Sequence, residues 1–250
     1  MTFGVKTMSE TCLTKKHRVL SGSVLKLIAV ITMLIDHTGY VFYAFPIFRQ
    51  PLFTALGETV TIYFILRKIG RLAFPIYCFL IGEGLRHTRN PIRYLARLLA
   101  FAILSEIPFN LMVRGALLCA DYQNVFFTLF LGALSIYFYR NIKSNLLKAL
   151  LLLVALGAST VLKADYGTAG MVIILLLYVL RGHPIVQALA GYPLFSGGIF
   201  AVAAFIPINM YNGKRGFIRH PILKYAFYLF YPLHMLLLVA IKQLILKGVI

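Results

Sequence analysis

The sequence predicts an all-α protein, a polytopic integral membrane bundle of about eight or nine transmembrane helices. Of its 250 residues, 60% are hydrophobic and only 13% are charged, and the mean hydropathy is +0.85. A soluble domain of this composition would have too little polar surface to face water. Apolar runs near the ~20 residues that cross a bilayer recur along almost the whole chain, which leaves no room for a separate soluble domain.

Basic residues outnumber acidic ones by 25 to 7, which gives a net charge of +18. They lie mainly between the apolar runs, where such residues orient helices and contact anionic lipid, so membrane lipid is an expected partner and nucleic acid is not. Basic groups at Lys15–Arg18, Arg86–Arg97 and Arg140–Lys148 fall on alternate connections, which places the N-terminus in the cytoplasm. We interpret residues 1–23 as a cytoplasmic N-terminal tail and residues 24–250 as one transmembrane domain.

The N-terminal half contains three clear spans and one ambiguous segment. Val24–Phe45 is apolar over enough residues to cross a bilayer. Leu52–Leu66 is either an interfacial helix or a short span. Leu72–Leu85 with its flanks forms the second span, and Asn90-Pro91 after it marks a break and a helix restart. Tyr94–Val113 is the third span.

The C-terminal half continues the pattern with short polar or basic loops between apolar runs. Ile185–Ile208 is interrupted by Gly191-Tyr192-Pro193, so it is either one span or a broken pair, and this choice decides between eight and nine helices. The remaining spans are Val125–Tyr139, Leu146–Leu162, Ala169–Leu180 and Ile222–Leu246.

Asp36 and His37 are ionisable neighbours near the end of the first span, where a charged group costs roughly 2.5–3.5 kcal/mol. Such residues usually face a cavity, so we expect a functional site, with a structural ion pair as the alternative. Lys26 precedes His37 by eleven residues, which puts both on nearly one helix face with a rise of about 16 Å. That spacing suits a long anionic donor whose phosphates stay at the surface. Asp36 lies about 100° round the helix from His37, so it either pairs with another helix or orients His37 indirectly.

Arg71, Glu83, Arg86 and His87 form a second candidate cluster on and around the next span. Arg86 and His87 follow Glu83 at i+3 and i+4, so these three share one face and partly neutralise each other. The alternative is that Arg86 and His87 only flank the membrane at its interface.

Glu106 and His234 are further polar residues inside apolar runs. Each lies beside a helix-distorting proline, Pro108 or Pro232, which fits a position facing an internal cavity. A buried carboxyl is protonated or paired, and Arg71 is the expected partner of Glu106. A lone histidine is more often structural.

Signatures of other chemistries are missing from the sequence. No Gly-rich phosphate loop, Ser-centred nucleophile elbow or His-Glu-x-x-His motif occurs. Cys12, Cys78 and Cys119 are scattered and lack metal-ligand spacing, so we expect neither a disulfide framework nor a metal site. Catalysis would be acid–base work by a histidine or carboxylate on a bound donor.

Several segments resemble, in order, the TraX family of polytopic bacterial membrane proteins. The segments are Leu25–Gly39, Ile69–Pro75, Glu83–Asn90, Tyr94–Leu98, Ser105–Phe109, Asn124–Leu129, Asp165–Gly167 and Phe230–His234. The resemblance implies a bacterial cytoplasmic (inner) membrane protein that N-acetylates a conjugative pilin subunit, with acetyl-CoA as the expected donor. The family also looks distantly similar to membrane-bound acyltransferases that modify sugars and lipids.

In those acyltransferases the first helix carries a basic residue and a later histidine at a spacing like that of Lys26 and His37. By this resemblance His37 is the general base, with Asp36 beside it, and Lys26 binds CoA phosphates. Histidine suits the role because imidazole titrates near neutral pH. Arg71, Arg86 or Asn124 would stabilise an oxyanion or anchor phosphates.

The leading hypothesis is therefore an acetyl-CoA-dependent N- or O-acetyltransferase that acts on an amine or hydroxyl of a peptide, glycan or lipid acceptor. The insert 46–69 is longer than the compact first connection expected in the family and would shape the acceptor site. The competing class is an ion-coupled secondary transporter that uses Asp36, Glu83 and Glu106, although no inverted repeat supports it. A third hypothesis is an assembly factor without catalysis.

Overall fold

The computed structural model describes residues 18–55, 57–195, 198–218 and 220–248, and most of them are helical, as predicted. Most of the proposed N-terminal tail, including Cys12, lies outside the described residues. In chain order the elements are α1 (Gly22–Phe42), α2 (Pro46–Arg49), β1 (Pro51–Ala55), β2 (Glu58–Thr61), α3 (Ile62–Gly70), α4 (Ala73–His87), α5 (Pro91–Leu104), α6 (Glu106–Arg114), α7 (Val125–Asn141), α8 (Asn145–Val161), α9 (Gly167–Val179), α10 (Pro184–Gly191), the 3-10 turn η1 (Tyr192–Leu194), α11 (Ile199–Val202), α12 (Phe205–Asn209) and α13 (Pro221–Leu246).

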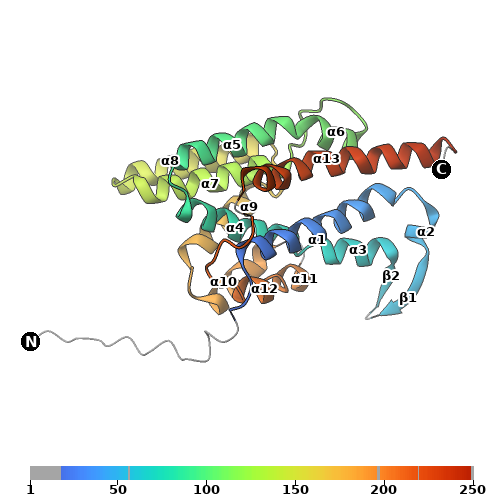
Figure 1. Cartoon of the computed structure of the whole chain (residues 1–250), viewed down its shortest axis with the longest axis horizontal. Helices are drawn as coiled ribbons and strands as arrows, with labels where there is room; N and C mark the ends of the chain where they lie inside the picture. Colours follow the sequence, from blue (N-terminus) through green and yellow to red (C-terminus); the bar gives the residue numbers. More distant parts are fainter. Residues whose placement is uncertain (1–17, 56, 196–197, 219, 249–250) are drawn as a thin grey trace, which may run out of the picture.

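Helix α4 lies at the centre of the bundle (Figure 1). It packs against α1 on one side and against α7 and α9 on the other, and α5 and α8 lie beyond α7. Most of its residues are buried, in keeping with this central place. Helix α1 also contacts α3 and α13, so one helix links the N-terminal insert to the C-terminal end of the chain.

Two helices of the described part, α1 and Ile222–Leu246 of α13, are long and apolar enough to cross a membrane. Ser21 caps α1 by accepting a hydrogen bond from the backbone N–H of Val24, and His220 caps α13 by accepting from that of Ile222. The bent pair α5 and α6 counts as a third span if it is taken together. The other apolar helices, such as α7 and α8, have 10–17 residues.

The predicted span Tyr94–Val113 is broken at Ser105, where α5 and α6 meet at a bend of 40°. Pro108 explains the break, because it has no N–H to donate to Leu104 and its ring clashes with that carbonyl. The predicted restart at Asn90-Pro91 is confirmed, since the Asn90 side chain caps α5 by accepting from Arg93 N–H.

The prediction of a helix over Leu52–Leu66 is wrong in its first part. An antiparallel hairpin of β1 and β2 occupies 51–61, and only then does α3 begin. Threonine and valine in β2 favour a strand over a helix, and Gly57 supplies the positive φ of +79° near the turn. Thr61 ends the strand and caps α3 through its side chain.

The segment Ile185–Ile208 is broken, which rules out one continuous helix. It consists of α10, η1, α11 and α12, and Pro193 lies within η1. The count of eight or nine spans stays a prediction.

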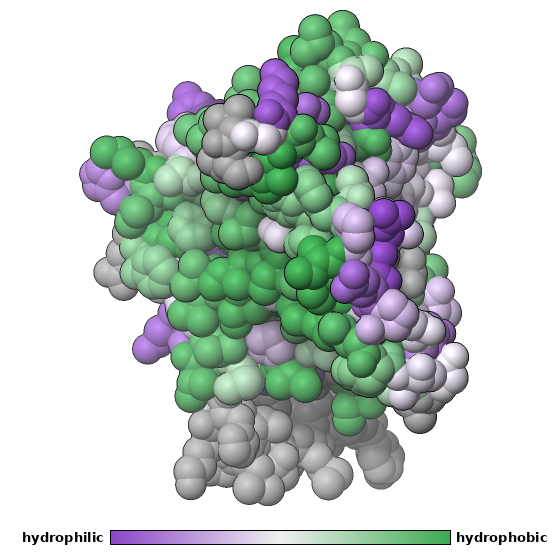
Figure 2. Space-filling model, turned by 90° about the vertical axis from the view of Figure 1, so that its right-hand side faces the viewer, coloured by the Kyte–Doolittle hydropathy of each residue, from purple (hydrophilic) through white to green (hydrophobic). Residues whose placement is uncertain are grey.

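Large apolar side chains cover the outside of several helices, as expected of a surface in contact with lipid. On α8, Leu146 is 73% exposed and Val161 is 83% exposed, and α13 carries a similar row of leucines. Hydrophobic residues also cover much of the face in Figure 2, where hydrophilic residues gather mainly along the top and the right-hand side. These surfaces are compatible with a membrane protein.

Candidate functional site

Two cavities follow one another along α1. The first, here called the basic cavity, has a volume of about 680 Å³ and lies beside Lys26. The second, here called the histidine cavity, has a volume of about 420 Å³ and is lined by Asp36 and His37. The predicted alignment of Lys26 with His37 therefore corresponds to two successive chambers rather than to one.

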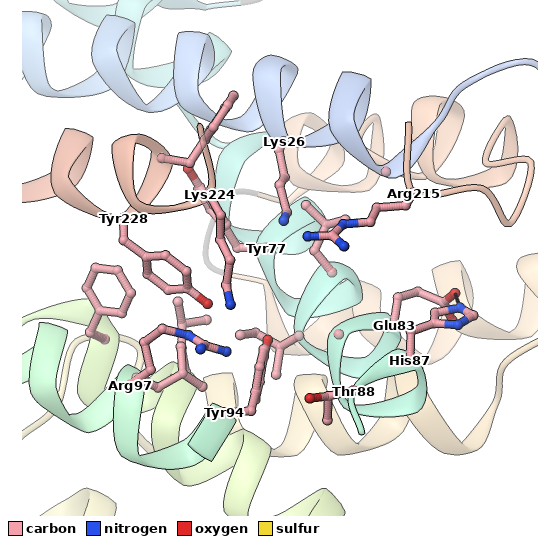
Figure 3. A pocket seen from close by; sticks show the side chains of 18 of the residues that line it. Lys26, Tyr77, Glu83, His87, Thr88, Tyr94, Arg97, Arg215, Lys224 and Tyr228 are labelled. Carbon is pink, nitrogen blue, oxygen red and sulfur yellow. Dashed lines mark ion pairs between the residues drawn. The ribbon is translucent and has the colours of Figure 1, made fainter. Parts of the chain in front are cut away.

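Four cationic side chains from separate parts of the chain converge on the basic cavity (Figure 3). Lys26 comes from α1, Arg97 from α5, Lys224 from α13, and Arg215 from the loop before α13. Figure 3 shows the four side chains pointing toward one another across the space. Like charges at close range repel, so this arrangement favours an anionic ligand between them.

Arg97 is held between two aromatic rings with part of its guanidinium unpaired. Its Cζ atom lies 5.6 Å from the ring centroid of Tyr94 and 5.7 Å from that of Tyr228. Its Nε atom is buried and has no hydrogen-bond partner among the described residues. A buried cationic donor without a partner is costly, which is a further reason to expect an anion here.

The carboxylate of Glu83 also borders the basic cavity, but it is already engaged. Arg181 holds it through two contacts, Nε to Oε1 at 2.5 Å and Nη2 to Oε2 at 3.2 Å. His87 Nε2 lies 3.5 Å from Oε2, and Figure 3 shows the two side chains close together. Glu83 therefore ties α4 to the end of α9 and does little to neutralise the convergent cations. The predicted proximity of Glu83 and His87 is confirmed.

A network of hydrogen bonds fixes the loop that carries Arg215 against the start of α1. Ser23 Oγ donates to the carbonyl of Arg215 at 2.7 Å and accepts from the N–H of Ile218 at 2.8 Å. Gly216 has a positive φ of +87°, and a Cβ at that position would overlap Ser21 Oγ. Only glycine permits this close approach, so the backbone itself brings Arg215 beside Lys26.

In the histidine cavity, His37 meets His234 across the α1–α13 contact. His37 Nδ1 lies 2.6 Å from His234 Nε2, and the two rings are parallel with centroids 4.9 Å apart. His234 Nδ1 lies 2.7 Å from the carbonyl oxygen of Phe230, one turn earlier in α13. His234 is only 4% exposed, so its ring contacts His37 and has little contact with solvent.

Asp36 pairs with Arg67 of α3, which decides between the two alternatives left by the sequence. The ion pair is possible because α3 packs very closely on α1: a Cβ at Gly70 would overlap the side chain of Asp36. Arg67 also lies over the ring of Tyr40, at 5.6 Å from its centroid. Asp36 thus helps to hold α1 against α3, and within the described part of the chain it makes no hydrogen bond to His37.

Asp165 is a further carboxyl in the histidine cavity, and it was not among the predicted site residues. It lies in the loop between α8 and α9 and accepts a hydrogen bond from the hydroxyl of Tyr122 at 2.5 Å. Burial raises the pKa of Asp165 above its usual range. In the sequence, Asp165 stood out only as part of the motif Asp165–Gly167. Its hydrogen-bond partner Tyr122 lies 43 positions away, so residue spacing did not connect the two.

A layer of four side chains lines both cavities, so it lies between them. It consists of Met33, Tyr77, Val125 and Tyr231, here called the partition. Met33 occupies the stretch of α1 between Lys26 and His37, and Tyr231 contacts both histidine rings edge-on. The partition is therefore the shortest link between the convergent cations and the histidine pair.

The remaining predicted residues fall elsewhere. Arg71 lines the histidine cavity and not the basic one, and Arg86 is exposed and lines neither.

Glu106 is not paired with Arg71 as expected: its carboxylate accepts hydrogen bonds from the side-chain amides of Asn124, at 2.5 Å, and Asn110, at 3.2 Å. Asn124 also donates to the carbonyl of Ala102, so this cluster braces the break between α5 and α6 against α7.

The chain resembles known proteins over most of its length. The chain matches the model of the family described as "TraX protein" over residues 21–242. It is 30% identical over 248 residues to the probable fimbrial assembly protein FimC, serogroup H1, of Dichelobacter nodosus, a match that covers 88% of this chain and 94% of that protein. No solved structure matches the chain.

Proposed function

The chain belongs to the TraX family, and from that premise we propose that it is an integral membrane acyltransferase. It transfers an acetyl group from acetyl-CoA to an amine or hydroxyl of an acceptor. A pilin-like peptide is the first acceptor to test, because the relative in D. nodosus is named as a fimbrial assembly protein. A glycan or lipid acceptor is the alternative.

The observation that carries the proposal is the basic cavity, one partition away from His37. Acetyl-CoA is a polyanion at one end and a neutral thioester at the other. Lys26, Arg97 and Lys224 suit its phosphates, and the partition suits the less polar arm that leads to the thioester. His37 lies about 16 Å of helix rise beyond Lys26, so the donor's two ends match the two cavities.

His37 is the general base of the proposed reaction. The unbonded nitrogen, Nε2, takes a proton as the acceptor nitrogen or oxygen attacks the thioester carbonyl. The tetrahedral intermediate then expels the CoA thiolate as the C–S bond breaks. His37 returns the proton to the sulfur, so the products are the acetylated acceptor and free CoA, and the imidazole is neutral again. Arg67 and Arg71 are the nearby cations of the cavity that would stabilise the oxyanion.

We propose that the protein resides in the bacterial inner membrane with eight or nine spans and a cytoplasmic N-terminus. The basic cavity then faces the cytoplasm, where acetyl-CoA is made, and the acceptor enters by the histidine cavity. The basic α7–α8 turn, with Arg140 and Lys143, falls on the same side as the donor.

The contacts of the carboxylates favour this function over ion-coupled transport. Asp36 is bound to Arg67, Glu83 to Arg181, and Glu106 to Asn124. A carboxylate that is already paired is a poor site for a coupling ion, since the ion would first have to displace its partner.

The test uses purified protein in lipid nanodiscs with radiolabelled acetyl-CoA. We expect Arg97→Met to weaken donor binding about 10-fold or more, because one charge-assisted contact is worth roughly 1.5–3 kcal/mol. Arg93→Met is the matched control, since Arg93 lies one turn earlier on α5, is exposed and lines neither cavity. His37→Ala should bind the donor normally and transfer no label. Equal loss of binding in both arginine variants, or full transfer by His37→Ala, would contradict the proposal.

A further inference from the structure

The contact between α1 and α13 contains an ordered series of three groups. The carbonyl oxygen of Phe230, the ring of His234 and the ring of His37 follow one another through contacts of 2.7 Å and 2.6 Å. Both distances are short enough for hydrogen bonds. The series begins on the backbone of α13 and ends in the histidine cavity.

The direction of each hydrogen bond follows from the chemistry of the first group. A carbonyl oxygen can only accept, so His234 Nδ1 must carry a proton. In a neutral ring His234 Nε2 is then an acceptor, and His37 Nδ1 must be the donor. His37 is thereby left with its lone pair on Nε2.

Neutral rings are the expected state for both histidines. Two imidazolium ions cannot share a hydrogen bond, and a buried cation without a carboxylate partner is costly. Both carboxyls of the histidine cavity are engaged elsewhere: Asp36 pairs with Arg67, and Asp165 accepts a hydrogen bond from Tyr122. Arg67 adds positive charge on the α3 side, which opposes a further cation.

We propose that His234 is a positioning residue that holds His37 in the tautomer with the proton on Nδ1 and the lone pair on Nε2. His234 takes the place that a carboxylate has in many catalytic triads, but as a neutral group anchored to a backbone carbonyl. The use of Nε2 as a base rests on the proposed acyl transfer; the tautomer itself does not. His234 touches His37 and no reacting atom.

The first test measures the tautomer directly. In ¹⁵N-histidine solid-state NMR spectra of the protein in lipid, His37 should show a protonated Nδ1 and an unprotonated Nε2 at neutral pH. In His234→Leu the hydrogen bond is lost, and we expect the signal of an Nε2-protonated His37 to appear. A wild-type His37 protonated on Nε2, or a tautomer unchanged in His234→Leu, would overturn the proposal.

The second test is rescue by a conservative variant. The amide oxygen of His234→Gln accepts from His37 Nδ1, and its NH₂ group donates to Phe230, so both hydrogen bonds are kept. We expect His234→Gln to keep kcat within a few-fold and His234→Leu to lose roughly 100-fold, with donor KM unchanged in both. The matched control is His183→Gln, an exposed histidine outside both cavities.

The two proposals fail in different ways. If His234→Gln is folded, as judged by its unfolding midpoint, but as inactive as His234→Leu, positioning is overturned, because the imidazole itself is then required. If the wild-type protein transfers no acetyl group while the NMR result stands, the acyltransferase proposal fails and the tautomer assignment remains.

Discussion

Asp36 and His37 are neighbours in the chain, yet they belong to different networks. The turn of about 100° per residue directs Asp36 to α3, where Arg67 holds it, and His37 to α13, where His234 meets it. His37, the proposed base, thus has no strong ionic contact. The Asp36–Arg67 pair still holds α1, the helix that carries His37, against α3. Of these two neighbours, Asp36 therefore has a structural role, and His37 is available for chemistry.

The Asp36–Arg67 pair should contribute to stability as a unit. Asp36→Asn leaves the Arg67 guanidinium without its counter-charge, and we expect a loss of about 1–3 kcal/mol. Arg67→Met should cost a similar amount, because it strands the carboxylate instead. The double variant should lose clearly less than the sum of the two, which reversible unfolding in SDS would measure. Strictly additive losses would show that the pair is not coupled.

Residue spacing within one helix was enough to predict part of the site. The period of 3.6 residues aligned Lys26 with His37, and the polar character of His234 within an apolar run marked it as unusual. Arg97, Arg215 and Lys224 were missed as a set, because each sits in a separate basic stretch that also fits an interfacial role. Nothing in the spacing says that three such stretches close on one cavity.

Glycine sets the distance between α1 and α3. Gly39 and Gly70 both lie in this contact, and a Cβ at Gly39 would come within 2.9 Å of Leu66 Cβ. Small residues at a helix interface allow backbones to approach closely, as is common within membranes. The close approach brings Arg67 within reach of Asp36. The ion pair therefore depends on the close packing of α1 against α3.

Gly70→Ala should therefore force the two helices apart. We expect a loss of about 1–3 kcal/mol from overpacking, together with reduced acetyl transfer, because Asp36 must shift. Gly157→Ala is the control: Gly157 is a helical glycine in α8, and a Cβ added there would have no described atom within 4 Å. That variant should be neutral or up to about 1 kcal/mol more stable. Unfolding midpoints and activity of the two purified variants check both expectations, and a stable, fully active Gly70→Ala would contradict them.

At the scale of elements, the long apolar helices were predictable and the irregular ones were not. Helices α7, α8 and α13 begin and end within a few residues of the predicted runs, since length and hydropathy determine them. The hairpin 51–61 was missed because its alternation is short and Ala55, Gly57 and Glu58 interrupt it. Pro108 signalled the break at Ser105, but the angle of that break depends on the packing of α6 against α13.

Across the whole molecule, charge differs sharply between the two cavities. Cations dominate the basic cavity, whereas the histidine cavity holds two carboxyls and two guanidinium groups. In the proposed reaction, this contrast would direct the polyanionic donor to one cavity and a neutral or zwitterionic acceptor to the other. This contrast depends on long-range contacts that composition alone does not reveal.

The proposed orientation can be tested with cysteines on either side of α7. This helix of 17 residues rises about 25 Å, with Cys119 before it and Lys143 after it. In a Cys12→Ser background, Cys119 should react with a membrane-impermeant maleimide in intact spheroplasts. With Cys119 also replaced by Ser, Lys143→Cys should react only after permeabilisation. Labelling of both positions from the same side would exclude α7 as a span.

The partition between the cavities has a consequence for the cell's energy supply. A passage that lets an acyl donor reach across a bacterial inner membrane is also a passage for protons, which would dissipate the gradient that drives ATP synthesis. Met33 and Val125 offer no group that carries a proton, and Tyr77 and Tyr231 are the other two side chains of the partition. Between turnovers of the proposed reaction, we expect these four side chains to limit the leakage of protons from one cavity to the other.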